Sequence, residues 1–328
     1  MQVFRGFHHA ALAPACALTI GNFDGVHRGH QAMLALLRSE AQHRGLPSTV
    51  LTFEPHPRDF FAKLAGKPDL APARIATLRD KLSELERCGI DQVVVLPFDQ
   101  RLARLSPDEF IDQVLVKGLG ARYVLVGDDF RFGAKRAGDY DFLDAAGSAR
   151  GFDVARMLSY EVHGTRVSSS VVREALVAGD MRQAAALLGR PYSISGHVIH
   201  GQKLGRDLGC RTLNVRFGHD KPATHGIFAV RTHGLAPHPL DGVASLGVRP
   251  TVEDAGRVLL EVHCFDWPAD LGAEGGYGKI VRVELLHKLR DEARYDGLEA
   301  LQEAIHQDIS DARVFFESQG RQTTRDRI

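Results

Sequence analysis

Residues 21–30, Gly-Asn-Phe-Asp-Gly-Val-His-Arg-Gly-His, follow a short apolar run at 17–20 and lead into a helical pattern. A strand, a glycine-rich turn and a helix in this order are typical of a phosphate site. The glycines let the backbone approach a polyphosphate, and the helix N-terminus offers unpaired N–H groups and partial positive charge. His27 and His30 add two donors in the first helical turn. The segment therefore predicts nucleotide chemistry at a phosphate.

The turn does not match the two common nucleotide motifs. It lacks the Gly-Lys-Ser/Thr end of a P-loop, and it is not Gly-x-Gly-x-x-Gly. His27-Arg28-Gly29-His30 instead resembles the HxGH signature of the nucleotidyltransferase superfamily, which includes the class I aminoacyl-tRNA synthetases. Two other interpretations stay open: a solvated turn with exposed histidines, or a His-x-x-His metal pair completed by His8 or His9.

The first half of the chain alternates strand-like and helix-like segments. Continuous apolar runs separated by helices predict an α/β fold with a parallel sheet covered on both faces, in which ligands bind beyond the carboxyl ends of the strands. The predicted strands are 17–20, 49–53, 92–96, 123–126 and 152–155, and the predicted helices are 31–44, 75–88, 108–117 and 140–149.

The second half has strand-like runs separated by turn residues, which predicts an antiparallel barrel or sandwich. Two short helices, one opened by Ser170 and one capped by Asp180, precede it, and 189–191 marks the linker. A last helix is predicted to begin at Asp296, with Glu299 completing a capping box. The predicted strands are 193–200, 212–217, 227–232, 243–246, 258–265 and 279–286.

Composition limits the partners and the compartment. The 328 residues suffice for two ordinary domains, and the formal net charge of zero argues against a general nucleic-acid surface. The four cysteines form no Cys-x-x-Cys pair, which favours reduced thiols over disulfides or zinc. No apolar run reaches the roughly 18 residues of a membrane span, and 10–20 runs straight into the phosphate turn rather than forming a signal peptide. We expect a cytoplasmic protein without nucleic-acid or membrane partners.

Three further segments of the first half lie at or just after strand ends or before a helix, so they can converge on one cleft. They are 53–57 (Phe-Glu-Pro-His-Pro), 127–133 (Gly-Asp-Asp-Phe-Arg-Phe-Gly) and 166–170 (Arg-Val-Ser-Ser-Ser). Each also has a purely structural interpretation, as a proline-stiffened loop, an aspartate-capped turn and a serine N-cap respectively.

Polar residues in the second half have similar alternatives. The glycine-studded loop 201–209 suits a phosphate or is a long hairpin connection. Thr212 and Asn214, at positions i and i+2, share one face of a strand, which suits Mg²⁺ and phosphate or is a polar surface pair. Glu261 and His263 share a face of an otherwise apolar strand. A carboxylate there needs a partner or a task such as deprotonating an alcohol, unless it simply faces solvent.

Taken in this order, the motifs resemble those of the bacterial bifunctional riboflavin kinase/FAD synthetases, or FMN adenylyltransferases. The likeness continues through 188–194 (Leu-Gly-Arg-Pro-Tyr-Ser-Ile) to the C-terminal helix. It implies a Rossmann-like nucleotidyltransferase domain at 1–188 and a riboflavin kinase domain at 189–328, an antiparallel Greek-key β-barrel with a C-terminal helix. The implied reactions convert riboflavin and ATP to FMN and ADP, and then FMN and ATP to FAD and pyrophosphate, with Mg²⁺.

The resemblance also implies residue roles. His27 and His30 would contact the ATP phosphates as catalytic groups, Glu261 would deprotonate the ribityl 5′-hydroxyl of riboflavin, and Thr212 and Asn214 would bind Mg²⁺ and ATP phosphates. The further ATP or phosphate ligands implied are Gly21, Asn22, Phe23, Asp24, Gly29, Arg166, Ser169, Ser170, Gly201, Lys203 and Gly205, and the implied flavin ligands are Phe53, Pro55, His56, Asp129, Phe130 and Arg249.

Three positions depart from the family pattern. Arg211 stands where the family usually has proline, so the strand entry is looser or the arginine adds a phosphate contact. Ser245 replaces a frequent asparagine, and Ser170 replaces a common threonine but keeps the hydroxyl. Because Glu261 and the Thr-x-Asn strand are retained, we expect an active kinase.

Other functions fit the same residues. The barrel could be catalytically silent and only bind flavin, or it could bind another ligand or single-stranded RNA. RNA binding would need exposed aromatics among basic residues, whereas the second half has only Trp267 with scattered Tyr and Phe and no basic stripe. A flavin sensor without turnover would not need Glu261. Weak or transient self-association is also left open.

Overall fold

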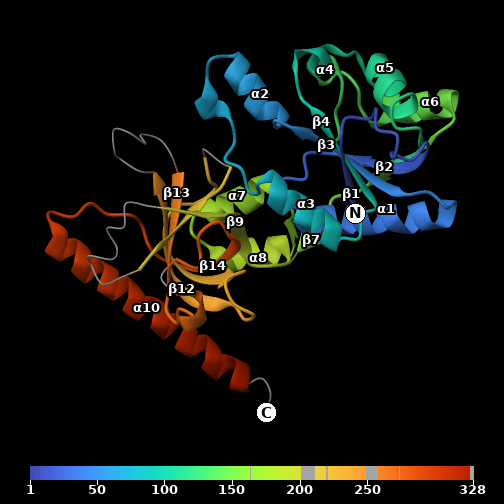
Figure 1. The fold of residues 1–328 in the computed structure, drawn as a ribbon. Coiled ribbons are helices and arrows are strands. Elements are labelled where there is room, and N and C mark those ends of the chain that lie inside the picture. The colour runs from blue at the N-terminus through green and yellow to red at the C-terminus, as the bar shows by residue number, and fades with distance from the viewer. Residues whose placement is uncertain (163, 201–210, 219–220, 249–257, 273, 326–328) are drawn as a thin grey trace. The chain divides into compact units, whose positions relative to one another are not determined.

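The computed structural model describes residues 1–162, 164–200, 211–218, 221–248, 258–272 and 274–325 (Figure 1). The chain forms two compact units, Met1–Pro72 with Leu78–Ser168 and Ala73–Thr77 with Ser169–Ile328. We call them the sheet unit and the barrel unit. Two short helices before residue 189 therefore group with the barrel, while the functional boundary at 188/189 stays a prediction.

The sheet unit is built on six parallel strands in the order β1-β4-β3-β2-β5-β6, which confirms the predicted α/β fold. Successive residues of β2 point to opposite faces. Ala17 packs with Leu34 and Leu37 of α1, whereas Leu18 packs with Leu143 of α6, so helices cover both faces. The strands are β1 Gln2–Arg5, β2 Cys16–Ile20, β3 Ser48–Glu54, β4 Gln92–Pro97, β5 Ala121–Gly127 and β6 Asp153–Met157.

Several elements of this unit differ from the predictions. Strand β1 and helix α2 were not predicted, the predicted helix 75–88 begins only at Leu78, and the predicted helix 108–117 is a short α5 followed by a π-helical turn. The helices are α1 Arg28–Arg44, α2 Pro57–Leu64, η1 Pro68–Leu70, α3 Leu78–Arg87, α4 Gln100–Arg104, α5 Pro107–Phe110, η2 Ile111–Val116, η3 Ala134–Arg136 and α6 Tyr140–Arg150, and a hairpin of β7 Glu161–Val162 and β8 Thr165–Arg166 follows β6.

The late start of α3 has a physical cause. Residues 73–77 belong to the barrel unit. The Arg74 N–H donates to the carbonyl of Lys221 at 3.2 Å, and Arg173 Nε donates to the carbonyl of Ala73 at 2.6 Å. Arg74 also forms an isolated β-bridge with Pro222. This pairing lies directly before Ile75, so tertiary contacts there override an apolar pattern that favours helix.

The barrel unit is a closed barrel of six antiparallel strands in the order β10-β13-β12-β11-β14-β9, which confirms the predicted barrel. Alternate residues Leu260, Val262 and Cys264 of β13 are buried inside it. The elements are α7 Ser169–Val177, α8 Met181–Leu188, β9 Tyr192–Ile199, β10 Leu213–Arg216, β11 Gly226–His233, β12 Leu240–Val248, β13 Val258–Cys264, η4 Ala269–Leu271, β14 Ile280–Arg290 and α10 Leu298–Arg325.

The predicted C-terminal helix is present and packs on the barrel. Ala312 and Ile309 of α10 lie against barrel residues that include Val243. Arg290 at the end of β14 donates to both carboxylate oxygens of the buried Asp308, at 2.7 and 2.6 Å. The helix begins at Leu298 rather than Asp296, so the predicted capping box is wrong. The first helical carbonyl bond runs from the Leu301 N–H to Gly297 at 3.3 Å.

Candidate active sites

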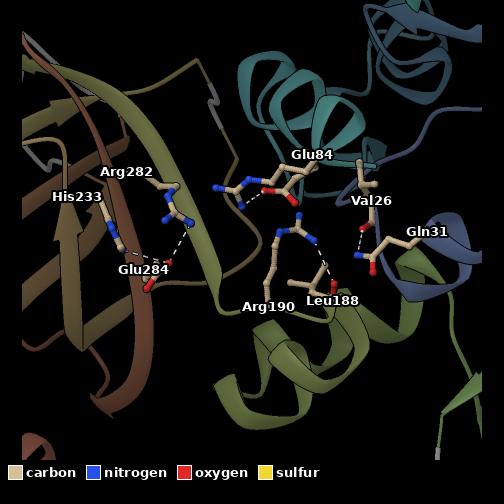
Figure 2. A network of polar contacts seen from close by, with 9 residues as sticks. Val26, Gln31, Glu84, Leu188, Arg190, His233, Arg282 and Glu284 are labelled. Atoms are coloured by element: carbon tan, nitrogen blue, oxygen red, sulfur yellow. Dashed lines mark hydrogen bonds and ion pairs between the residues drawn. The ribbon is translucent and has the colours of Figure 1, made fainter. Parts of the chain in front are cut away.

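The turn 21–30 joins β2 to α1, as predicted, and its backbone is unusually constrained. Phe23 and Val26 adopt φ values of 48° and 41°, which non-glycine residues rarely do and β-branched residues almost never do. The side chain of Gln31 in α1 donates to the carbonyl of Val26 at 2.9 Å and holds this conformation (Figure 2). Strain of this kind persists only where the surroundings fix it, and it is common at ligand sites.

His27 and His30 stack on one another at the start of α1. Their ring centroids are 3.6 Å apart and nearly parallel. His27 is the N-cap of the helix, and its Nδ1 accepts from the His30 N–H at 3.3 Å. When the imidazole is neutral, this acceptor role leaves the proton on Nε2. His27 thus has a hydrogen-bond donor that the helix cap does not use.

Lys81 of α3 is a site residue that the sequence did not single out. It is fully buried, and its Nζ donates to Thr52 Oγ1 at 3.3 Å, while Thr52 Oγ1 donates to the carbonyl of Asn22 at 3.4 Å. Burial lowers the pKa of His30 well below its usual value, and the positive charges of His27 and Lys81 lower it further. His30 is therefore neutral near pH 7. Only its position on an amphipathic helix could have pointed to Lys81.

Two buried polar atoms in this region have no hydrogen-bond partner within the described residues: Asn22 Oδ1 and His30 Nδ1. Buried polar groups are normally paired, so these two atoms offer unused hydrogen-bonding capacity to a ligand at the turn. Gly29 also keeps the turn open, because a Cβ there would lie 3.3 Å from the His27 ring and 3.4 Å from the carbonyl of Val167. The 166–168 segment therefore lies against the histidine turn.

The loop after β5 meets the hairpin that carries Arg166. Asp128 accepts from Arg166 at 3.0 Å and from the Ser159 hydroxyl at 2.6 Å, and Asp129 lies 3.7 Å from Arg166. Since β5 and β2 are neighbours in a parallel sheet, this ion-paired group and the histidine turn emerge at the same edge. The structure therefore brings Arg166 and Asp129 together with the predicted phosphate turn.

The loop after β3, the other neighbour of β2, is largely aromatic. Phe53 packs edge-on against Phe98, with 5.7 Å between ring centroids, and Phe60 and Phe61 pack against the same ring. The buried His56 is the N-cap of α2, and its Nδ1 accepts from the Arg58 N–H at 3.1 Å. The sequence offered only a proline-stiffened loop as the structural alternative here, so the capping role of His56 was not predicted. Pro55 is exposed beside it, and Phe130 stacks on Phe132 at 5.4 Å after β5.

The barrel site is defined by strand register. Asn214 of β10 pairs with Glu261 of β13, and Glu261 pairs with Ser245 of β12. Residues opposite one another in antiparallel strands share a face. Since the neighbouring Leu213, Val215, Leu260, Val262, Ala244 and Leu246 are buried inside, these three polar residues form a row on the outer face of the barrel. We call Asn214, Glu261 and Ser245 the polar row.

The polar row offers ligands for a cation. Asn214 is 7% exposed, and its Oδ1 is buried without a hydrogen-bond partner within the described residues. Thr212 comes directly before β10, at position i−2, and its side chain is half-buried. Amide and hydroxyl oxygens suit Mg²⁺, which keeps several waters and takes few protein ligands. The oxygens present thus fit the predicted ion.

Arg211 is held more firmly than the loss of proline suggested. Its guanidinium lies over the Trp267 ring, 3.9 Å from the centroid, and donates to the carbonyl of Gly272 at 3.0 Å. Trp267 Nε1 donates to the same carbonyl at 2.9 Å. The carbonyl of Arg211 lies 2.8 Å from His263 Nδ1. A cation–π clamp thus holds the approach to β10, while the two alternatives for Arg211, a looser strand entry and an added phosphate contact, stay predictions.

The remaining predicted site residues fall into three groups. Ser169 and Ser170 start α7 in the barrel unit, whereas the histidine turn is in the sheet unit. Gly21, where a Cβ would lie 3.0 Å from the Phe23 ring, and the buried Asp24 lie in the turn itself. Gly201, Lys203, Gly205 and Arg249 lie outside the described residues.

Comparison with known sequences identifies both units. Residues 9–171 match the FAD synthetase family, and residues 188–316 match the riboflavin kinase family. The bifunctional riboflavin kinase/FMN adenylyltransferase of Escherichia coli (strain K12) is 45% identical over 96% of this chain and 98% of that relative. This chain belongs to the bifunctional riboflavin kinase/FMN adenylyltransferase family. The member from Pseudomonas fluorescens is 47% identical over 96% of this chain and 97% of its own length.

The fold agrees with a solved structure of nearly the same extent. A crystal structure titled macrolide-efflux protein, from Streptococcus pneumoniae, superposes with a TM-score of 0.76 and 25% identity over 95% of this chain and 99% of that one. Its title describes that protein and is not carried over to this member of the riboflavin kinase/FMN adenylyltransferase family. Among the described residues, the helices are too short or too polar to cross a membrane.

Proposed function

We propose that the barrel unit phosphorylates riboflavin to FMN and that the sheet unit adenylylates FMN to FAD. Family membership along almost the whole chain supports both activities. The observation that carries the proposal is that each unit holds its own set of side chains suited to phosphate chemistry. These are the stacked histidines at a helix N-terminus in the sheet unit and the polar row in the barrel unit.

In the kinase reaction, Glu261 takes the proton of the ribityl 5′-hydroxyl, whose oxygen then attacks the γ-phosphorus of ATP. The new O–P bond forms as the bond to the ADP oxygen breaks. Thr212 and Asn214 would hold Mg²⁺ on the neighbouring strand, and Gly201, Lys203 and Gly205 would approach the ATP phosphates. When bound, Mg²⁺ neutralises charge on the phosphate oxygens. General base catalysis contributes about 10² to 10⁴ in rate.

In the adenylyl transfer, an FMN phosphate oxygen attacks the α-phosphorus of ATP in line, and pyrophosphate leaves. His27, whose Nδ1 caps the helix, and the neutral His30 stacked on it are proposed to form hydrogen bonds to the ATP phosphates. Positioned donors of this kind stabilise developing charge on a phosphoryl oxygen. The other residues proposed to hold ATP here are Gly21, Asn22, Phe23, Asp24, Gly29, Arg166, Ser169 and Ser170.

The aromatic loop after β3 and the loop after β5 are proposed to hold the flavin. Phe53, Pro55 and Phe130 offer apolar surface to an isoalloxazine ring, His56 fixes α2 beside it, and Asp129 lies with Arg166 at the phosphate end. Arg249 is proposed to contact flavin in the kinase domain. We propose a cytoplasmic location, a functional boundary at 188/189, and small molecules rather than nucleic acids or membranes as partners.

Product analysis by chromatography tests both reactions in one experiment. The full-length protein is incubated with riboflavin, ATP and Mg²⁺, beside Glu261→Ala and His30→Ala. We expect FMN and FAD from the native protein, FMN alone from His30→Ala, and neither product from Glu261→Ala. Supplied FMN should restore FAD formation by Glu261→Ala. A native protein that converts FMN but leaves riboflavin untouched would contradict the kinase assignment and favour a silent barrel.

A further inference from the structure

The backbone of Arg166 is held beside the histidine turn. Arg166 ends the β7–β8 hairpin, in which it pairs with Glu161. The next residue, Val167, donates its N–H to the carbonyl of Tyr160 at 2.8 Å. The carbonyl of Val167 lies so close to α1 that a Cβ at Gly29 would be 3.4 Å from it. The hairpin therefore fixes the point from which the Arg166 side chain extends.

Asp128 holds the other end of this side chain. The two oxygens of its carboxylate accept from different donors: Arg166 Nη2 donates to Oδ1 at 3.0 Å, and the Ser159 hydroxyl donates to Oδ2 at 2.6 Å. Ser159 lies in the connection between β6 and β7, so three segments of the sheet edge meet at this carboxylate. A short hydrogen bond from a hydroxyl to a carboxylate is strong, so Ser159 restricts rotation of the carboxylate and keeps Oδ1 directed at Arg166.

The ion pair leaves part of the guanidinium available. The contacts of Arg166 with Asp128 at 3.0 Å and with Asp129 at 3.7 Å both use Nη2. Among the described residues, Nε and Nη1 of Arg166 have no acceptor, and the side chain is 52% exposed. A guanidinium carries five N–H groups in one rigid plane. A carboxylate that holds one nitrogen therefore sets the direction in which the other two can donate.

We propose that Asp128, anchored by Ser159, is a positioning residue of adenylyl transfer, which directs Nε and Nη1 of Arg166 toward the ATP phosphates. An arginine loses conformational entropy when it binds an anion, and a contact that already orders the side chain reduces this cost. The inference rests on the proposed role of Arg166 in ATP binding. Asp128 acts through Arg166 and needs no contact with substrate.

Steady-state FAD formation from supplied FMN by full-length variants tests this role. Asp128→Asn should raise KM for ATP about fivefold and change kcat by less than about twofold, because an ion pair exposed to solvent contributes modestly. Ser159→Ala should raise KM for ATP about twofold, whereas Ser159→Thr keeps the hydroxyl and should stay near the native value. A merely structural role would reduce the folded fraction, which lowers kcat and leaves KM native.

Asp153→Asn is the matched control. Asp153 also pairs with an arginine, Arg44, at 2.6 Å, but it begins β6, whereas Asp128 follows the carboxyl end of β5. The two carboxylates therefore lie at opposite edges of the parallel sheet. KM for ATP should stay native in Asp153→Asn, and thermal unfolding followed by circular dichroism verifies that each variant is folded.

The decisive variant combines Asp128→Asn with Arg166→Gln. If Asp128 acts through Arg166, Asp128→Asn should cause no further rise in KM for ATP once Arg166 is replaced. An equal rise in both backgrounds, or a native KM in Asp128→Asn alone, overturns the inference. A lower KM in Asp128→Asn also overturns it, because the carboxylate would then compete with ATP for Arg166. If Arg166→Gln forms FAD normally, the proposed role of Arg166 fails as well, and if only Arg166→Gln is impaired, the role of Asp128 alone fails.

Discussion

The two sites of this chain are assembled in different ways. In the sheet unit, one turn of consecutive residues and the helix that follows supply the stacked histidines and the open N-terminus. In the barrel unit, Asn214, Glu261 and Ser245 come from three strands and meet only through register. A motif of consecutive residues can be recognised in the sequence. Residues that meet through strand register can be grouped into a site only when the strand order is known.

The two sites also differ in what lies beneath them. The histidine turn rests on buried groups such as Lys81, so its chemistry is tied to the packing of the sheet unit. The polar row stands on the outer face of a closed barrel whose interior is apolar. We therefore expect changes in the first site to alter stability and ionisation as well as rate, and changes in the second to alter rate with little effect on stability.

The largest expected effect is that of Asn214→Ala. It should lower kcat/KM for MgATP in the kinase reaction about a hundredfold, because the proposed Mg²⁺ ligand is lost and the ion stabilises charge on the phosphate oxygens. Steady-state rates at increasing Mg²⁺ measure this, and excess Mg²⁺ should recover part of the loss. Asn214→Asp keeps an oxygen ligand and serves as the matched variant. An unchanged Mg²⁺ requirement in Asn214→Ala would remove the residue from the metal site.

Lys81→Met should lower FAD formation about tenfold and leave riboflavin phosphorylation unchanged. The variant loses the hydrogen bond to Thr52, and bonds from charged donors contribute about 1.5 to 3 kcal/mol. Removal of a positive charge should also raise the pKa of His30, which NMR titration can follow. Lys117→Met, at an exposed position, is the control. A native titration curve for His30 would show that Lys81 does not act on it.

The sheet unit should lose stability in mild acid. The pKa of His30 is lower in the folded state than its ordinary 6.5. Its contribution is therefore complete above pH 6.5 and declines as the pH falls below that value, by at most about 1.4 kcal/mol per pH unit. Amide hydrogen exchange in α1 measures this slope, which His30→Gln should reduce. The exposed His43→Gln should keep it, and an equal slope in His30→Gln would refute the assignment.

The smallest effect concerns the Arg211 clamp. Arg211→Ala and Trp267→Ala should each lower kcat/KM of the kinase about threefold, because cation–π contacts contribute about 0.5 to 2 kcal/mol. The double variant should be no slower than either single variant, because each single substitution already removes the contact between the two side chains. Independent, additive losses would mean that the two side chains act separately. Arg211→Pro, which stiffens the backbone in another way, should keep the native rate.

The sequence predicted the α/β half, the barrel and the turn between β2 and α1 because each rests on local periodicity. It could not predict that the helix begins only at Leu78, because the residues just before it, Ala73 and Arg74, bond to segments far along the chain. It also missed α2, whose start depends on the His56 cap rather than on an apolar repeat.

The site residues also divide into those that the sequence could predict and those that it could not. His27, His30 and Glu261 could be proposed from motifs and from a charge within an apolar strand. Lys81 could not, because nothing in its own segment shows that it lies under the histidine turn. Arg211 was noticed as a departure, but its partner Trp267 is 56 positions away in sequence.

The short piece Ala73–Thr77 makes the chain pass from the sheet unit to the barrel unit and back before its final crossing at Ser168–Ser169. The two units are therefore interleaved along the gene rather than placed end to end. Exchange of a complete kinase half between relatives, by recombination or in a designed chimera, would have to transfer this upstream piece together with the downstream sequence. A single crossover at the linker would combine the barrel of one relative with the 73–77 piece of another.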